Sequence, residues 1–130
     1  AFTPGTHAST FGGNPVASAA AVATMEVLLA NGFLPRVEET GLYLRGRLSE
    51  LAQRFPQHIV AVRGMGLLLG AVLSESTAAQ GTAIVNRMFE RGYLLNFAGN
   101  VALRFAPPLV VERGDIDTMI AALAEVLAEL

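Results

Sequence analysis

The stretch IVAVRGMGLLLGAVL, residues 59–73, decides the fold that this sequence predicts. It is a run of β-branched residues and leucines, interrupted by glycines and preceded by the helix-breaking pair Phe55-Pro56. Apolar runs that are interrupted by glycines and preceded by a proline are typical of strands separated by turns. We therefore expect strands at Ile59–Val62 and Met65–Leu73.

Helical patterns flank these strands. Leucine and valine recur at helical spacing, with charges between them, over residues 34–54, and a second apolar stripe runs over residues 113–130. A further helix is predicted from Ser76 or Thr77 to about Arg91-Gly92. These helices are amphipathic, so we expect each to pack on a sheet.

A small hairpin is predicted between the last two helices. Tyr93–Asn96 and Val101–Phe105 have strand composition, and Ala98-Gly99-Asn100 has the chemistry of a tight turn. The fold class that follows is α/β, as an α+β two-layer arrangement in which a small, mainly antiparallel sheet is covered by helices on one face.

The N-terminal stretch GTHASTFGGNP, residues 5–15, combines hydroxyls, glycines and a helix start. Asn14 can cap free N–H groups and Pro15 suits the first helical position, which predicts a helix to about residue 30 that ends at Asn31-Gly32. A helix N-terminus favours an anion, and Ser9 and Thr10 add hydroxyl donors. The loop can therefore hold a phosphate, although an ordinary helix cap is the alternative.

Composition narrows the class of protein. The chain has 130 residues, a formal net charge of −2, no cysteine and two histidines. Nucleic acid binding is disfavoured because no basic run exists, and a cysteine or zinc site is disfavoured by the residue counts. The apolar stretch at residues 16–30 is broken by polar side chains, so we interpret it as a buried helix and not as a membrane span. We expect a cytoplasmic protein that contacts no membrane.

Three separated motifs carry a family resemblance: residues 5–15, VRGMGLLLG at 62–70 and LRFAPPL at 103–109. In this order they resemble the class III (ornithine-type) pyridoxal-phosphate aminotransferases, within which the acetylornithine branch is most similar. The resemblance implies the C-terminal portion of a fold type I enzyme. Its parts would be a cofactor-phosphate loop at the edge of the large domain (1–14), a connecting helix (15–31) and the C-terminal small domain (32–130).

The resemblance also implies chemistry. The cofactor would be pyridoxal 5′-phosphate in a homodimer, the amino donor N-acetylornithine or a similar compound, and the acceptor 2-oxoglutarate, in arginine biosynthesis. Thr10 would bind the phosphate of the cofactor held mainly by the other subunit, Ser9 would lie beside the substrate, and Arg104 would meet a carboxylate. His7 is expected to hydrogen-bond within the loop, and Arg63 to hold the strand turn.

All cationic side chains are arginines, so the Schiff-base lysine that this family uses is absent. We expect no catalytic residue and no metal ligand in this chain. As part of a longer aminotransferase it would be inactive alone, would not hold the cofactor by itself, and would need the large cofactor domain of its own chain and a dimer partner. Two alternatives remain: a stand-alone amino-acid-binding module, and an association domain that dimerises through its first helix.

Overall fold

A computed structural model describes residues 3–5 and 8–130. The chain forms two compact units, Ala1–Leu34 and Pro35–Leu130. The elements, in chain order, are α1 (Pro15–Leu29), α2 (Phe33–Arg54), β1 (Ile59–Met65), β2 (Leu68–Leu73), α3 (Glu75–Ala78), α4 (Gly81–Glu90), β3 (Asn96–Ala98), β4 (Ala102–Phe105) and α5 (Arg113–Ala128).

The first described unit is a loop followed by α1. Asn14 caps the helix, because its side-chain oxygen accepts from the Ala17 N–H at 3.0 Å, and Pro15 occupies the first turn. Gly32 has a φ of +85°, the left-handed conformation expected after the helix. None of the residues of α1 is buried, although the helix is apolar. The prediction of a helix is confirmed.

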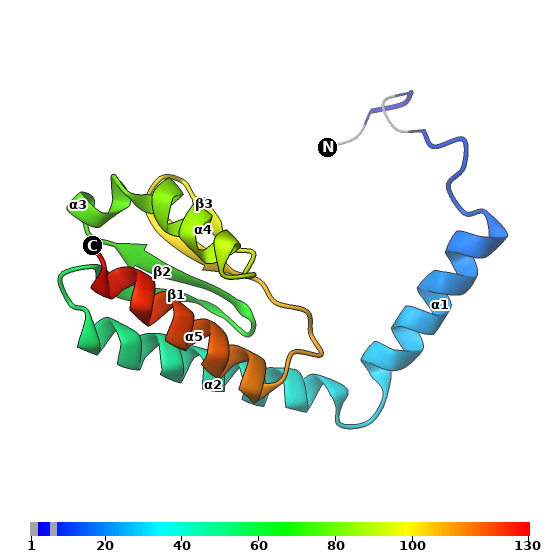
Figure 1. The fold of residues 1–130 in the computed structure, drawn as a ribbon. Helices are drawn as coiled ribbons and strands as arrows, with labels where there is room; N and C mark the ends of the chain where they lie inside the picture. Colours follow the sequence, from blue (N-terminus) through cyan, green and yellow to red (C-terminus); the bar gives the residue numbers. More distant parts are fainter. Residues whose placement is uncertain (1–2, 6–7) are drawn as a thin grey trace. The chain divides into compact units, whose positions relative to one another are not determined.

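The second unit is built on a four-stranded sheet with the order β1-β2-β4-β3. Every pairing is antiparallel, and Figure 1 shows the helices of this unit gathered against the sheet. The side chains of β2 alternate between buried and partly exposed, as expected for a sheet covered on one face. The predicted α+β two-layer class is confirmed.

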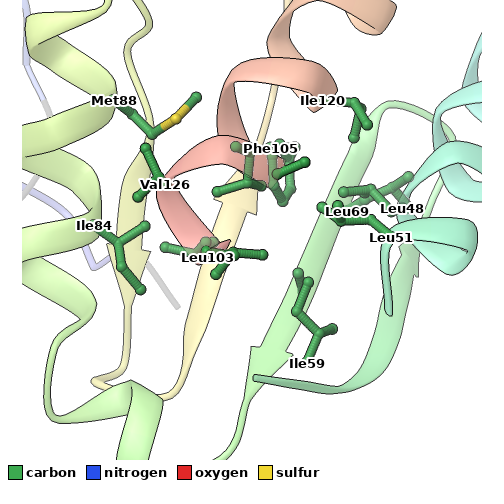
Figure 2. Close-up of a cluster of buried hydrophobic side chains, with 14 of the residues drawn as sticks. Leu48, Leu51, Ile59, Leu69, Ile84, Met88, Leu103, Phe105, Ile120 and Val126 are labelled. Atoms are coloured by element: carbon green, nitrogen blue, oxygen red, sulfur yellow. The ribbon is translucent and has the colours of Figure 1, made fainter. Parts of the chain in front are cut away.

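The hydrophobic core lies between the covered face of this sheet and its helices (Figure 2). Leucines from α2, β2 and β4 meet apolar residues of α4 and α5 in one cluster. Its most completely buried side chains include Leu48, Leu69, Ile84, Leu103 and Leu123.

The turn between the first two strands is held by α2 through close backbone contact. A Cβ atom at Gly41 would lie 2.6 Å from the carbonyl carbon of Gly66, so only glycine allows this approach. The Arg45 guanidinium donates a hydrogen bond to the carbonyl of Gly64, which has a φ of +120°. Met65–Leu68 therefore forms the turn, and the predicted strand starting at Met65 begins three residues later.

The predicted helix from Ser76 or Thr77 to Arg91 is two helices, α3 and α4. Its second part begins at Gly81, where an added Cβ atom would lie 2.3 Å from the ring of Phe97 in β3. This contact requires a glycine, which stands at the first residue of α4. The break between the two helices therefore lies where α4 meets the sheet.

The hairpin is present, but its first strand lies closer to the turn than predicted. Gly99 and Asn100 have φ values of +59° and +55°, the combination that a tight hairpin turn needs. The resulting register pairs Asn96 with Arg104. Residues 93–95 lie outside the strand. The register would place Tyr93 opposite Pro107, and a proline has no N–H to pair.

Candidate functional sites

The loop before α1 presents two exposed hydroxyls. Gly12 donates its N–H to the Ser9 carbonyl at 3.2 Å, which folds the chain into a turn, and Asn14 donates to the Phe11 carbonyl at 2.8 Å. Ser9 and Thr10 are both exposed on this turn. Within residues 3–5 and 8–130, neither hydroxyl has a hydrogen-bond partner, so both are available to a ligand.

This arrangement fits a phosphate group. Thr10 offers a hydroxyl four residues before the N-cap of α1, and the positive end of the helix dipole lies at the same terminus. His7, for which we predicted a hydrogen bond in this loop, lies outside the described residues. The chain contains no lysine, so it has no lysine amine that could hold a cofactor covalently.

Arg104 lies in the second unit, on the open face of the sheet. In β4 the side chains of Leu103 and Phe105 enter the core, and Arg104 between them is exposed on the opposite face. It pairs with Gly70 of β2 on one side and with Asn96 of β3 on the other. A guanidinium so placed can bind a carboxylate through two parallel hydrogen bonds.

Arg63 does not have the role predicted for it. The strand turn is held by Arg45, whereas Arg63 is exposed and pairs with Gly70 from the other side of β2. Arg63 and Arg104 line a shallow hollow of about 340 Å³ on the open sheet face, together with Gly70, Ala98 and Ala102 among others. Sequence reasoning missed this pairing, because only the register of three strands reveals it.

The ionic network between α2 and α5 is structural. The Tyr43 hydroxyl donates to Asp117 at 2.7 Å, and Arg47 bonds both Asp117 and Glu50. The hydrogen bond to Asp117 raises the pKa of Tyr43. Burial alone would lower the pKa of Arg47, but the two carboxylates outweigh it and raise that pKa.

The apolar hollow beside Pro107 and Pro108 carries no reactive chemistry. It has a volume of about 370 Å³ and is lined mainly by apolar side chains, such as Phe105 and Met119. Its one carboxylate, Asp115, accepts the Glu112 N–H in the cap of α5. In the described part of the chain no three histidine, cysteine, aspartate or glutamate side chains gather as metal ligands. No single described helix has the length and apolar character of a membrane span, and only α1 and α2 taken as a pair pass that test, by length and composition alone.

Comparison with known proteins identifies the family. The class-III aminotransferase family matches residues 1–127, and the chain belongs to it. Acetylornithine aminotransferase of Thermosynechococcus vestitus is 43% identical over 129 residues, which are 99% of this chain and 31% of that protein. The chain therefore spans about a third of the length of this relative.

Solved structures agree with this assignment. Lysine aminotransferase from M. tuberculosis has a TM-score of 0.86 and 35% identity, with 98% of this chain and 29% of that one covered. N-acetylornithine aminotransferase from Stenotrophomonas maltophilia has a TM-score of 0.82 and 32% identity, with 91% and 32% covered. The family is thus fixed, whereas the named amino donors differ between these two structures.

Proposed function

We propose that this chain is the C-terminal part of a pyridoxal-phosphate-dependent aminotransferase that transfers the terminal amino group of N-acetylornithine, or a similar compound, to 2-oxoglutarate in arginine biosynthesis. Membership of the class-III family carries this proposal. The acetylornithine aminotransferase name of two curated relatives supports the choice of donor.

The loop before α1 would serve the cofactor. When bound, pyridoxal phosphate supplies an electron sink for the carbon that carries the amino group. Thr10 would donate its hydroxyl and backbone N–H to the phosphate of the cofactor held mainly by the other subunit of a homodimer. The exposure of Thr10 and its place before the helix support this role. Ser9, one residue earlier, would contact the substrate.

Arg104 would bind a substrate carboxylate. Arg104 is exposed on the sheet and has no acidic partner among the described residues. Its guanidinium is therefore able to donate hydrogen bonds to a carboxylate of a ligand. A guanidinium at this position could bind a carboxylate of either proposed substrate through two parallel hydrogen bonds.

The remaining parts of the enzyme would come from outside these residues. We propose that residues 1–14 belong to the edge of the large cofactor domain, 15–31 to a connecting helix and 32–130 to the small domain. The apolar composition of α1 supports partners of this kind, because apolar surface is stabilised by burial. The amine that binds the cofactor would lie in the large domain, so the 130 residues alone would be inactive.

The test measures glutamate formed from 2-oxoglutarate by the complete gene product and by the 130 residues alone. N-acetylornithine and lysine serve as alternative donors. We expect turnover by the complete product with N-acetylornithine, and none by the 130 residues. Turnover with lysine alone would overturn the choice of donor, and a complete product without any transamination would overturn the function.

A further inference from the structure

The turn between α1 and α2 contains an asparagine followed by a glycine, Asn31-Gly32. The Phe33 N–H donates to the Ala30 carbonyl at 3.1 Å and closes the turn around this pair. Both residues are exposed. Gly32 has a φ of +85°, and nothing lies within 4 Å of the place where its Cβ atom would be. The turn therefore presents an asparagine side chain and an unshielded peptide group side by side.

Neither group is held by a hydrogen bond. Among the residues that the structure describes, the Asn31 side-chain amide and the Gly32 N–H have no hydrogen-bond partner. The residue four positions after Asn31 is Pro35, which has no N–H to donate to the Asn31 carbonyl. Glycine tolerates either sign of φ, so the peptide between Asn31 and Gly32 is able to rotate. Rotation brings the Gly32 nitrogen toward the Cγ atom of Asn31.

We propose that Asn31 is a site of spontaneous deamidation, at which the side-chain amide becomes a carboxylate through a cyclic imide. Hydroxide from water removes the proton of the Gly32 N–H, and this nitrogen attacks Cγ of Asn31. The N–Cγ bond forms, the Cγ–Nδ2 bond breaks, and ammonia leaves with a proton returned by water. No atom is oxidised or reduced.

Water then opens the imide ring at one of its two carbonyl carbons. Cleavage of the bond from the Gly32 nitrogen to Cγ gives aspartate at position 31. Cleavage of the bond from the same nitrogen to the main-chain carbonyl carbon gives isoaspartate, in which the chain continues through the side chain. Either product adds one negative charge to a chain whose formal net charge is −2.

The start of α2 favours both the reaction and its product. The deprotonated nitrogen and the tetrahedral intermediate are anionic, and Gly32 directly precedes the first residue of this helix. The positive end of the helix dipole stabilises negative charge at this place. Since α2 has no acidic residue in its first turn, the new carboxylate would meet no anion there.

The other asparagines lack this combination. Each is followed by a proline or by a residue that lies in a helix, in a strand or in a hydrogen-bonded turn: Asn14, Asn86, Asn96 and Asn100. Asn100 is the closest comparison, because it too is exposed in a turn. The nitrogen that follows it is engaged, however, since the Val101 N–H donates to the Ala98 carbonyl at 3.2 Å. Val101 is also branched at Cβ, which crowds an attack by its nitrogen.

The test incubates the complete gene product in mildly alkaline buffer, both folded and unfolded in urea. Peptide mass spectrometry follows the exchange of the amide NH₂ for OH at each asparagine, and enzymatic methylation of isoaspartate identifies the product of ring opening. Asn31→Gln removes the site, because glutamine would have to form a larger ring. Asn86→Gln, at an exposed position of α4, is the matched control. Both replacements are at exposed residues, so the melting temperature should not change.

We expect Asn31 to react in the folded protein at a rate within about tenfold of its rate in urea, because opening the turn breaks one backbone hydrogen bond. Asn100 should react at least about tenfold more slowly than Asn31 in the folded protein. Isoaspartate should form at position 31, at a rate that rises in proportion to the hydroxide concentration. Asn31→Gln should abolish this signal, and Asn86→Gln should leave it unchanged.

Three results would overturn the proposal. The first is a folded protein in which Asn31 stays intact, whether or not the chain in urea reacts. The second is aspartate without isoaspartate at position 31, which direct hydrolysis of the amide would give. The third is an isoaspartate signal that persists in Asn31→Gln. None of these measurements depends on transamination, so the proposed function stands or fails separately.

Discussion

Two glycines of α2 should respond in opposite ways to the same substitution. Gly41 is buried against the turn of the first hairpin, whereas Gly46 is exposed, with nothing within 4 Å of the place where a Cβ atom would lie. Alanine at an exposed helical position is favoured over glycine by about 1 kcal/mol. Gly46→Ala should therefore stabilise the second unit by up to that amount.

At Gly41 the same gain is outweighed by a clash. The added atom would lie 2.6–2.8 Å from backbone atoms of Gly66, which cannot rotate away as a side chain could. Overpacking costs about 1–3 kcal/mol, and contact with backbone places this case at the upper end. After subtraction of the helix gain, Gly41→Ala should destabilise by about 1–2 kcal/mol.

Urea unfolding of the 130 residues, followed by circular dichroism, measures both variants. The unit Pro35–Leu130 encloses one continuous core, so we expect it to unfold in one cooperative transition. The two variants should differ by about 2–3 kcal/mol in their free energies of unfolding. Equal stabilities, or a more stable Gly41→Ala, would refute the close packing of α2 on this turn.

Four further substitutions test other parts of the structure. Leu103 is fully buried in β4, so Leu103→Ala should lower the free energy of unfolding, measured in urea, by about 2–5 kcal/mol. Leu94 is 85% exposed, so Leu94→Ala should change this free energy by less than about 0.5 kcal/mol. Similar losses for the two variants would refute the placement of the core. Tyr43→Phe removes the bond to Asp117; because the folded pKa is raised above 10.0, this bond contributes fully below that pH and is lost as the pH rises through the raised pKa. Its melting temperature should be below that of the wild type at pH 8 and should converge with it in strong alkali, and a difference that persists there would contradict the assignment. Asn14→Ala removes the cap of α1 and should reduce helical circular dichroism, while unchanged ellipticity would show that the cap contributes nothing.

The helices were predictable because their signals are local. The start at Asn14-Pro15 and the periodic leucines of α2 indicate their helices without reference to the rest of the chain. The break before Gly81 was not predictable in this way, and the close packing of Gly81 on the ring of Phe97, in a distant strand, has no local signal in the sequence. Strand ends were missed for the same reason, because pairing partners decide them.

The residues of the candidate site also divide into those that a local motif indicates and those that only the strand pairing reveals. Ser9, Thr10 and Arg104 could be selected from motifs, and their functional roles remain predictions. Arg63 was assigned to the wrong task, because a residue beside a glycine turn gives no sign of which arginine contacts the carbonyl. Its alignment with Arg104 appears only through the register across Gly70.

The central claim is that the loop before α1, through Thr10, contributes to a pyridoxal phosphate site. The most direct test is the Kd of pyridoxal phosphate for the complete gene product with Thr10→Ala, compared with Thr10→Ser and with Thr82→Ala, an exposed threonine of α4. The account predicts a Kd about tenfold higher for Thr10→Ala, and values near the wild type for the other two. An unchanged Kd for Thr10→Ala would contradict the phosphate role of this loop.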